Sequence, residues 1–156
     1  MKRTCLVCVL CLVSVLAGFA FRPPPPIDLA RHVDLSSHIF IGTAVDMIVV
    51  DGQGNVLKPE PPNLTNFGSA EMTVQITETL LPVGWQTNRP VKVRFGGAAF
   101  SVEALRKRFL DKKLIYLTVL QGADFQPSYP WHLTEPLDTR AQIESAIRSN
   151  KVTTAK

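Results

Sequence analysis

Residues 38–50 read HIFIGTAVDMIVV, and this stretch decides the fold class. β-Branched and aromatic residues dominate it, as is typical of a strand. Its side chains alternate in part between two faces, with Ile39, Ile41, Thr43 and Val45 on one and Phe40, Gly42 and Ala44 on the other. A glycine within a strand commonly marks the bend that a curled sheet needs. We therefore predict one long strand, bent at Gly42.

Other segments of the sequence also predict strands. Residues 71–81 and 91–95 alternate apolar and polar side chains, whereas residues 113–120 are almost uniformly apolar, as is typical of a central strand buried on both faces. A short edge strand is predicted at residues 131–133. The proline-containing stretch 51–69 has few apolar residues, so it is predicted as a long surface loop, either functional or merely connecting.

Helices are predicted around these strands. Residues 27–33, 101–110 and 138–150 carry apolar side chains at helical spacing, and Ser101 and Asp138 can cap the first turns of the last two. Strands and helices do not alternate regularly along the chain. This order predicts a mainly β fold with flanking helices: a small antiparallel barrel of about five strands plus a C-terminal helix.

The first 20 residues have the features of a signal peptide for export. Lys2 and Arg3 precede an apolar run over residues 5–21, and Gly18 and Ala20 supply the small residues needed for cleavage after Ala20. An uncleaved membrane anchor is the alternative, because the run reaches the lower limit of roughly 17 residues for a spanning helix.

The rest of the chain is predicted as one domain. Prolines make residues 21–26 a stiff spacer. Residues 27–150 are expected to form a single β-barrel domain, and residues 151–156 to form a frayed tail.

Composition limits the possible functions. The three cysteines, Cys5, Cys8 and Cys11, all lie in the predicted signal, so the mature chain has no disulfide, no thiolate metal site and no cysteine nucleophile. An exported domain without cysteines suits a bacterial periplasm. The formal charge of +4 falls to +2 once Lys2 and Arg3 are removed, which gives no indication of nucleic-acid binding.

Three segments carry a resemblance to a known group of proteins. Residues 37–45 (SHIFIGTAV), 73–81 (TVQITETLL) and 112–120 (KKLIYLTVL) resemble strands of small exported bacterial proteins with an OB-like, netrin/TIMP-type barrel. The resemblance spans about residues 27–148 and implies an OB-like fold. TIMP inhibitors place an N-terminal cysteine amine on a protease zinc. No cysteine begins the predicted mature chain, so that inhibitory mechanism does not carry over.

The sequence offers no catalytic constellation. His32, His38 and His132 stand at no metal-binding spacing, and surface or capping roles are expected for His32 and His38. Ser101 lacks the glycines of a nucleophile elbow, and the carboxylates of Asp46, Asp51, Glu71 and Glu78 are scattered. We therefore predict no enzyme activity, no cofactor and no metal.

Two groups of residues are candidates for binding a partner. The basic run Arg106, Lys107 and Arg108 could attract an acidic partner, although such runs are often the solvated face of a helix. The second group is aromatic and lies among prolines, which favours rigid recognition; alternatively, it fills the end of the barrel. It consists of Phe125, Tyr129, Trp131 and His132.

These observations predict an exported, non-enzymatic protein-binding module with a secreted or envelope protein as its partner. The most concrete version is a periplasmic inhibitor or immunity protein that occludes a secreted toxin or hydrolase. The alternative is an envelope module that binds an oligosaccharide or an anionic lipid headgroup.

Overall fold

The computed structural model describes residues 27–64, 68–85, 89–96, 100–130 and 132–153. The predicted signal peptide, the spacer at 21–26 and Trp131 lie outside the described residues. In the part described, no helix is long and apolar enough to cross a membrane.

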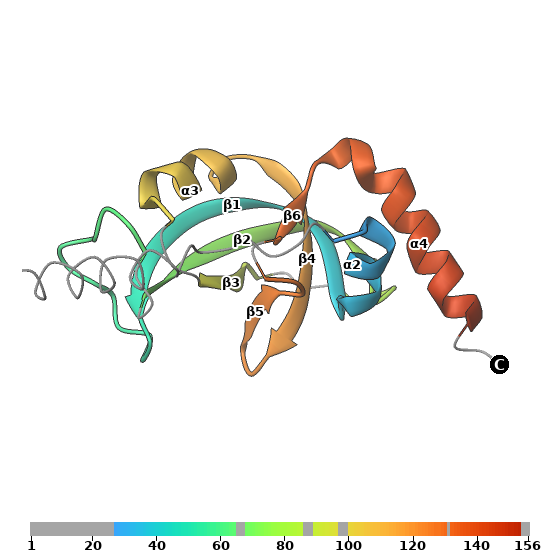
Figure 1. The fold of residues 1–156 in the computed structure, drawn as a ribbon, viewed down its shortest axis with the longest axis horizontal. Helices are drawn as coiled ribbons and strands as arrows, with labels where there is room; N and C mark the ends of the chain where they lie inside the picture. Colours follow the sequence, from blue (N-terminus) through green and yellow to red (C-terminus); the bar gives the residue numbers. More distant parts are fainter. Residues whose placement is uncertain (1–26, 65–67, 86–88, 97–99, 131, 154–156) are drawn as a thin grey trace, which may run out of the picture.

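The described residues form a mainly β fold flanked by helices (Figure 1). In chain order the elements are α2 (Leu29–Leu35), β1 (His38–Asp51), β2 (Gly68–Leu81), β3 (Val91–Gly96), α3 (Val102–Phe109), β4 (Lys113–Gln121), β5 (Asp124–Pro127), β6 (Thr134–Glu135), the short 3-10 helix η1 (Leu137–Thr139) and α4 (Arg140–Thr153).

The strands form one sheet in the order β1-β2-β3-β5-β4-β6, and β4 also pairs with β1. Every pairing is antiparallel except that of β3 with β5, which is parallel and consists of the single pair Val93 and Phe125. The sheet is therefore not a closed antiparallel barrel, which corrects the prediction. The physical reason lies in β5, which is short and ends at Pro127, a residue with no N–H to donate to a neighbouring strand.

Strand β1 is bent and buried as the sequence predicted. Its pairing with β2 is irregular between Ile41 and Gly42 and again between Ala44 and Asp46, as it also is at the start of the strand, between Ile39 and Phe40. A side chain at Gly42 would lie 2.8 Å from the carbonyl oxygen of Gln75, so only glycine fits this close approach. The second irregularity moves the inward-facing positions from even to odd numbers, which buries Met47 after Ala44.

Two hydrophobic cores lie on opposite faces of the sheet. The larger includes Phe40, Met72, Phe95 and Tyr116 and is covered by the buried face of α3. The smaller joins α2 and α4 to the other face of β1 and β4, through Val33, Ile39, Ile41, Ile115, Leu117, Ile143 and Ile147. Figure 1 shows α3 over β1 and α4 beside α2 at the opposite end of the sheet.

Strand β4 is the central strand that the sequence predicted. It pairs with β1 on one side and with β5 and β6 on the other. The loop after β1 is better anchored than predicted, because Leu64 is buried in the larger core and its N–H donates to the carbonyl of Phe100.

Three elements near the C-terminus differ from the prediction. Strand β5 is not indicated by the sequence, because its only large apolar residue is Phe125 and it ends in proline. The predicted edge strand at 131–133 lies later, at β6. Helix α4 begins at Arg140 and continues past Asn150 to Thr153.

Candidate functional site

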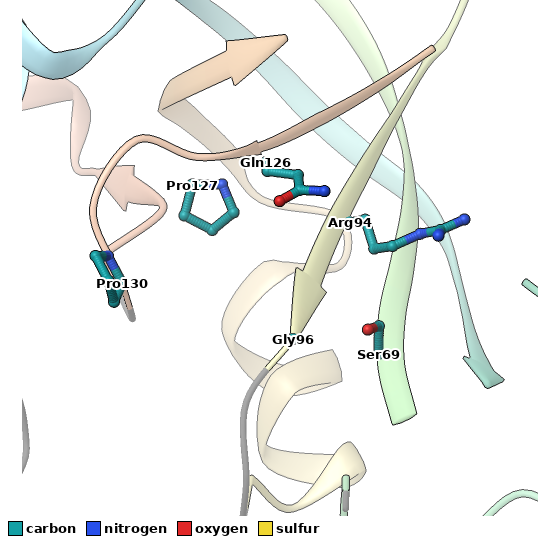
Figure 2. A pocket seen from close by; sticks show the side chains of 6 residues that line it. All are labelled: Ser69, Arg94, Gly96, Gln126, Pro127 and Pro130. Atoms are coloured by element: carbon teal, nitrogen blue, oxygen red, sulfur yellow. The ribbon is translucent and has the colours of Figure 1, made fainter. Parts of the chain in front are cut away.

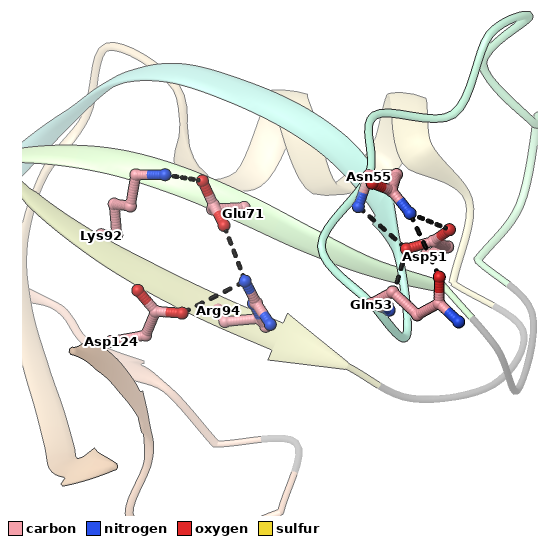
Figure 3. Close-up of polar contacts among 7 residues, drawn as sticks. All are labelled: Asp51, Gln53, Asn55, Glu71, Lys92, Arg94 and Asp124. Carbon is pink, nitrogen blue, oxygen red and sulfur yellow. Dashed lines mark hydrogen bonds and ion pairs between the residues drawn. The ribbon is translucent and has the colours of Figure 1, made fainter. Parts of the chain in front are cut away.

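A line of paired charges crosses β2, β3 and β5. Glu71 of β2 lies opposite Arg94 of β3, and its two carboxylate oxygens accept from Lys92 Nζ at 2.6 Å and from Arg94 Nη2 at 3.0 Å. The same Arg94 Nη2 lies 3.1 Å from Asp124 Oδ2 on β5. Figure 3 shows these four side chains reaching across the three strands. The line holds two positive and two negative charges, so it is fixed in place and balanced.

Burial and pairing act against each other on Glu71, whose side chain is only 7% exposed. Burial alone would raise the pKa of Glu71, but hydrogen bonds and charges from Lys92 and Arg94 outweigh it, so the pKa is lowered. The hydrogen bond to Glu71 correspondingly raises the pKa of Lys92. Glu71 and Lys92 are therefore both charged at neutral pH.

A hollow of about 290 Å³ opens beside Arg94, where β3 and β5 separate after their single pair. We call it the groove, and it is lined by Ser69, Arg94, Gly96, Gln126, Pro127 and Pro130. Figure 2 shows Gln126 pointing toward Arg94, with Pro127 and Pro130 on the far side. The hydroxyl of Ser69, the side chain of Arg94 and the amide of Gln126 thus line a space that is stiffened on one side by two prolines. Such a lining can bind a polar chain through hydrogen bonds.

The end of β1 next to this sheet face is held by Asp51. Its Oδ1 accepts from the backbone N–H groups of Gln53 and Asn55 at 2.8 and 2.9 Å (Figure 3). Hydrogen bonds from Asn55 lower the pKa of Asp51. This arrangement is an ordinary turn, and it gives the residue a structural role.

The predicted basic run on α3 is engaged with carboxylates of its own chain. Both Nη atoms of Arg106 donate to Glu60, and one of them also lies 3.3 Å from the carbonyl oxygen of Met47. Lys107 pairs with Glu103 one turn away at 2.7 Å. The guanidinium of Arg108 lies 5.2 Å from the centre of the Phe109 ring. Two of the three predicted cations therefore have a counter-charge within the molecule.

The predicted aromatic group is divided by the fold. Phe125 is 4% exposed and packs against Trp85 and Phe40, so the structure corrects its predicted role as a surface contact. The reason is that Phe125 points inward from β5 into the larger core. Tyr129 and His132 gather elsewhere, around His32, and Trp131 lies outside the described residues.

His32 lies inside the protein, which corrects the surface or capping role predicted for it. Its side chain is 0% exposed, and neither ring nitrogen has a hydrogen-bond partner. The rings of Tyr129 and His132 lie 6.4 and 6.3 Å away, and Glu135 Oε1 is 3.9 Å from its Nδ1. Burial, together with the charge on His132, lowers the pKa of His32 to about 4, while the backbone of His132 acts weakly in the opposite direction. We call His32, Tyr129, His132 and Glu135 the histidine cluster.

The histidine cluster brings two imidazoles and a carboxylate together, which the spacing along the chain did not predict. His32 has no exposed surface, so a substrate cannot reach its ring in this conformation. Within the described ranges, no group of three His, Cys, Asp or Glu side chains could hold a metal ion. The third histidine, His38, packs separately against Trp85 and Phe125, and burial lowers its pKa.

Several groove residues were missed by sequence reasoning. The alternation of residues 91–95 did indicate that Lys92 and Arg94 point away from the core, and Glu71 precedes the matching alternation on β2. Pairing Glu71 with Arg94 needed the register between the two strands. No sequence signal indicated Gln126, because β5 itself was not predicted.

Comparisons with known proteins add no relative. No protein-family model matches the sequence, and a search of curated proteins finds no match. The geometry of the groove and of the histidine cluster is therefore what supports an assignment of function.

Proposed function

We propose that this protein is an exported, non-enzymatic binding module that holds a protein partner in the groove between β3 and β5. Its most concrete form is a periplasmic inhibitor or immunity protein that occludes a secreted toxin or hydrolase. A binding module of this kind needs only a complementary surface, so it carries no catalytic motif.

The preorganised wall of the groove is the observation that carries the proposal. Arg94 is held from both sides by Glu71 and Asp124, and Pro127 and Pro130 restrict the backbone opposite. A surface that is already fixed loses little conformational freedom when a partner binds. Because the charges of the wall are balanced, the partner is expected to be recognised through polar groups and an extended backbone.

The arrangement of the elements supports an OB-like fold as the finer description. The strands follow the order β1-β2-β3-β5-β4, β4 returns to β1, and α3 lies between β3 and β4. OB-folds are partly open five-stranded structures that bind polymers on the face of their second and third strands. The groove lies beside those strands.

Binding of an anionic lipid or glycan through α3 is the weaker alternative. It requires Arg106, Lys107 and Arg108 to meet an external anion, yet Arg106 and Lys107 already have carboxylate partners. An external anion would first have to displace Glu60 and Glu103.

Co-purification from the native host tests the proposal. Tagged wild-type protein is compared with Gln126→Trp, which fills the groove, and with Gln75→Trp, which places the same ring on an exposed position of β2 outside it. We expect an exported enzyme to be enriched with the wild-type and Gln75→Trp proteins and lost with Gln126→Trp. The purified enzyme should lose activity when about one equivalent of wild-type protein is added.

Three outcomes would count against the proposal. Enrichment of no exported enzyme would contradict the protein partner, and equal enrichment by Gln126→Trp would contradict the groove. Saturable binding to anionic vesicles or oligosaccharides that disappears in high salt and in Arg106→Gln would favour the alternative.

A further inference from the structure

One wall of the groove is tied to helix α2. We call residues 128–130 and 132 the proline segment, because they include Pro130 of the groove. Ser36, at the end of α2, donates from Oγ to Ser128 Oγ at 2.8 Å, and Ser128 in turn donates from its backbone N–H to the carbonyl of Leu117 at 3.2 Å. The position of Pro130 therefore depends on contacts between the proline segment, α2 and β4.

The histidine cluster lies at this same junction. His32 projects from α2 against Tyr129 and His132, whose rings also lie 5.8 Å from each other and which flank Pro130 in the chain. Tyr129 and His132 also pair with each other through the His132 N–H and the Tyr129 carbonyl, at 3.2 Å. A change in the space that His32 needs would therefore act directly on the proline segment.

The imidazole of His32 is a weak point in this junction. It is fully buried and lacks a hydrogen-bond partner on either nitrogen. Such an arrangement is stable only while the ring is neutral. A protonated ring would carry two donors, and the nearest carboxylate oxygen, Glu135 Oε1, lies 3.9 Å from Nδ1, beyond hydrogen-bonding distance.

We propose that protonation of His32 releases the proline segment from α2 and opens the groove, so that the protein binds its partner near neutral pH and releases it in mildly acidic solution. The part of this inference that concerns the partner rests on the proposed function. The conformational step concerns this chain alone and can be tested without a partner.

Charged and titratable groups reach His32 from several elements. The proline segment contributes His132 and Tyr129, and the charge of a protonated His132 disfavours a second charge on His32. Strand β6 contributes Glu135; burial raises the pKa of this group, while the charges of His132 and of Arg108 on α3 act to lower it. The Glu135 carboxylate therefore offsets only part of the free-energy cost of placing a positive charge on His32.

The smaller core adjoins α2 at Val33, the residue that follows His32, and consists of apolar side chains that cannot solvate a charge. Its members from β4 and α4 are Ile115, Leu117, Ile143 and Ile147. Water can hydrate the protonated ring only if the proline segment or α2 moves away, so proton binding is coupled to opening.

The size of the effect follows from linkage. The pKa of His32 is about 4 in the closed state and about 6.5 once the ring is solvated. The ratio of open to closed molecules should then rise roughly 20-fold between pH 7 and pH 5.

Amide hydrogen exchange, corrected for the intrinsic rate at each pH, measures this ratio. We expect the protection of residues 29–35 and of the Ser128 and His132 amides to fall roughly 20-fold between pH 7 and pH 5, while the amides shared by β1 and β2 keep theirs. His32→Phe, which cannot be protonated, should remove the pH dependence. His38→Phe, at a partly buried histidine outside the histidine cluster, should retain it.

A direct titration of the His32 ring by NMR in the wild-type protein keeps the test decisive if His32→Phe does not fold. A ring that titrates near its ordinary pKa would overturn the inference, as would unchanged protection at pH 5 or equal pH dependence in His32→Phe. If the segment opens but a partner identified by co-purification stays bound at pH 5, the link to the groove is wrong while the proposed function stands.

Discussion

The groove and the histidine cluster lie on two sides of the same proline segment and treat buried polar groups in opposite ways. At the groove, Glu71 is nearly buried but meets two cations, and Arg94 meets two carboxylates. In the cluster, His32 is fully buried and both of its ring nitrogens lack a hydrogen bond.

The two regions should therefore respond differently to a fall in pH. A paired carboxylate with a lowered pKa stays charged until the solution is strongly acidic. An unpaired buried imidazole is stable only in its neutral form. It therefore destabilises the folded state when the pH falls below the pKa of the imidazole in the unfolded chain. The groove should therefore be rigid over a wide pH range, and the junction behind it should not.

The largest expected effect is the loss of stability at the histidine cluster in acid. The pKa of His32 is lowered from 6.5 to about 4, so the unfolded chain binds a proton between these values and the native state does not. The His32 contribution is complete above pH 6.5 and decreases as pH falls, by about 3 kcal/mol at pH 4. Urea unfolding of wild type and His32→Phe at pH 7 and at pH 4 should show this difference.

A comparison between the two proteins is needed because other groups titrate in the same range. The raised pKa of Glu135 acts in the opposite sense and stabilises the native state as pH falls. Equal losses of stability in wild type and His32→Phe would contradict the contrast between the two regions.

The next effect tests the groove. Glu71→Gln removes the charge that holds Lys92 and Arg94, and it should cost about 2 kcal/mol at pH 7, as expected for hydrogen bonds to a charged group. The pKa of Glu71 is lowered, so its contribution is present above pH 4.5 and decreases only as pH falls below that value. Wild type and variant should therefore converge only as the pH falls below 4.5, which is the acidic end of the His32 window.

Glu103→Gln is the matched control, because Glu103 and its partner Lys107 are both 77% exposed. It should change stability by less than about 0.5 kcal/mol. A Glu71→Gln variant as stable as this control would mean that the charge line does not fix the groove.

A smaller effect is expected where the two regions are joined. The Ser36 Oγ lies 2.8 Å from both the carbonyl oxygen of His32 and Ser128 Oγ. Ser36→Ala should cost about 1 kcal/mol and increase the exchange of the Ser128 and His132 amides more than that of amides in β1. Uniform loss of protection throughout the sheet would show that the junction is not a separate unit.

Local patterns predicted most elements of this fold. These elements depend on residues close together in the sequence. Examples are the apolar stretch of β1, the alternation in β2 and β3 and the Ser101 cap of α3, while Gly42 marks the bend. The sequence also predicted the central position of β4, since its run of apolar residues requires cover on both faces.

The candidate sites depended on contacts that no local pattern contains. Strand β5 has one large apolar residue and a terminal proline, so neither its parallel pair with β3 nor the groove beside it could be predicted. His32 and His132 are a hundred residues apart in the sequence, and their approach follows from how α2 and the proline segment meet. For Phe125 the local context was misleading. Its proline-rich surroundings suggested a surface residue, but its side chain is buried in the core.

The smallest effect is expected at α3, outside both regions. Arg106 and Glu60 form a two-point ion pair, but their side chains are 39% and 35% exposed, so solvent screens it. Arg106→Gln should cost about 0.5–1 kcal/mol at low salt and less in 1 M NaCl, and it should leave partner binding at the groove unchanged. Urea unfolding at two salt concentrations and co-purification with the variant check both statements. A loss of partner binding here would mean that the recognition surface extends over α3, because the groove and the histidine cluster contain no part of that helix.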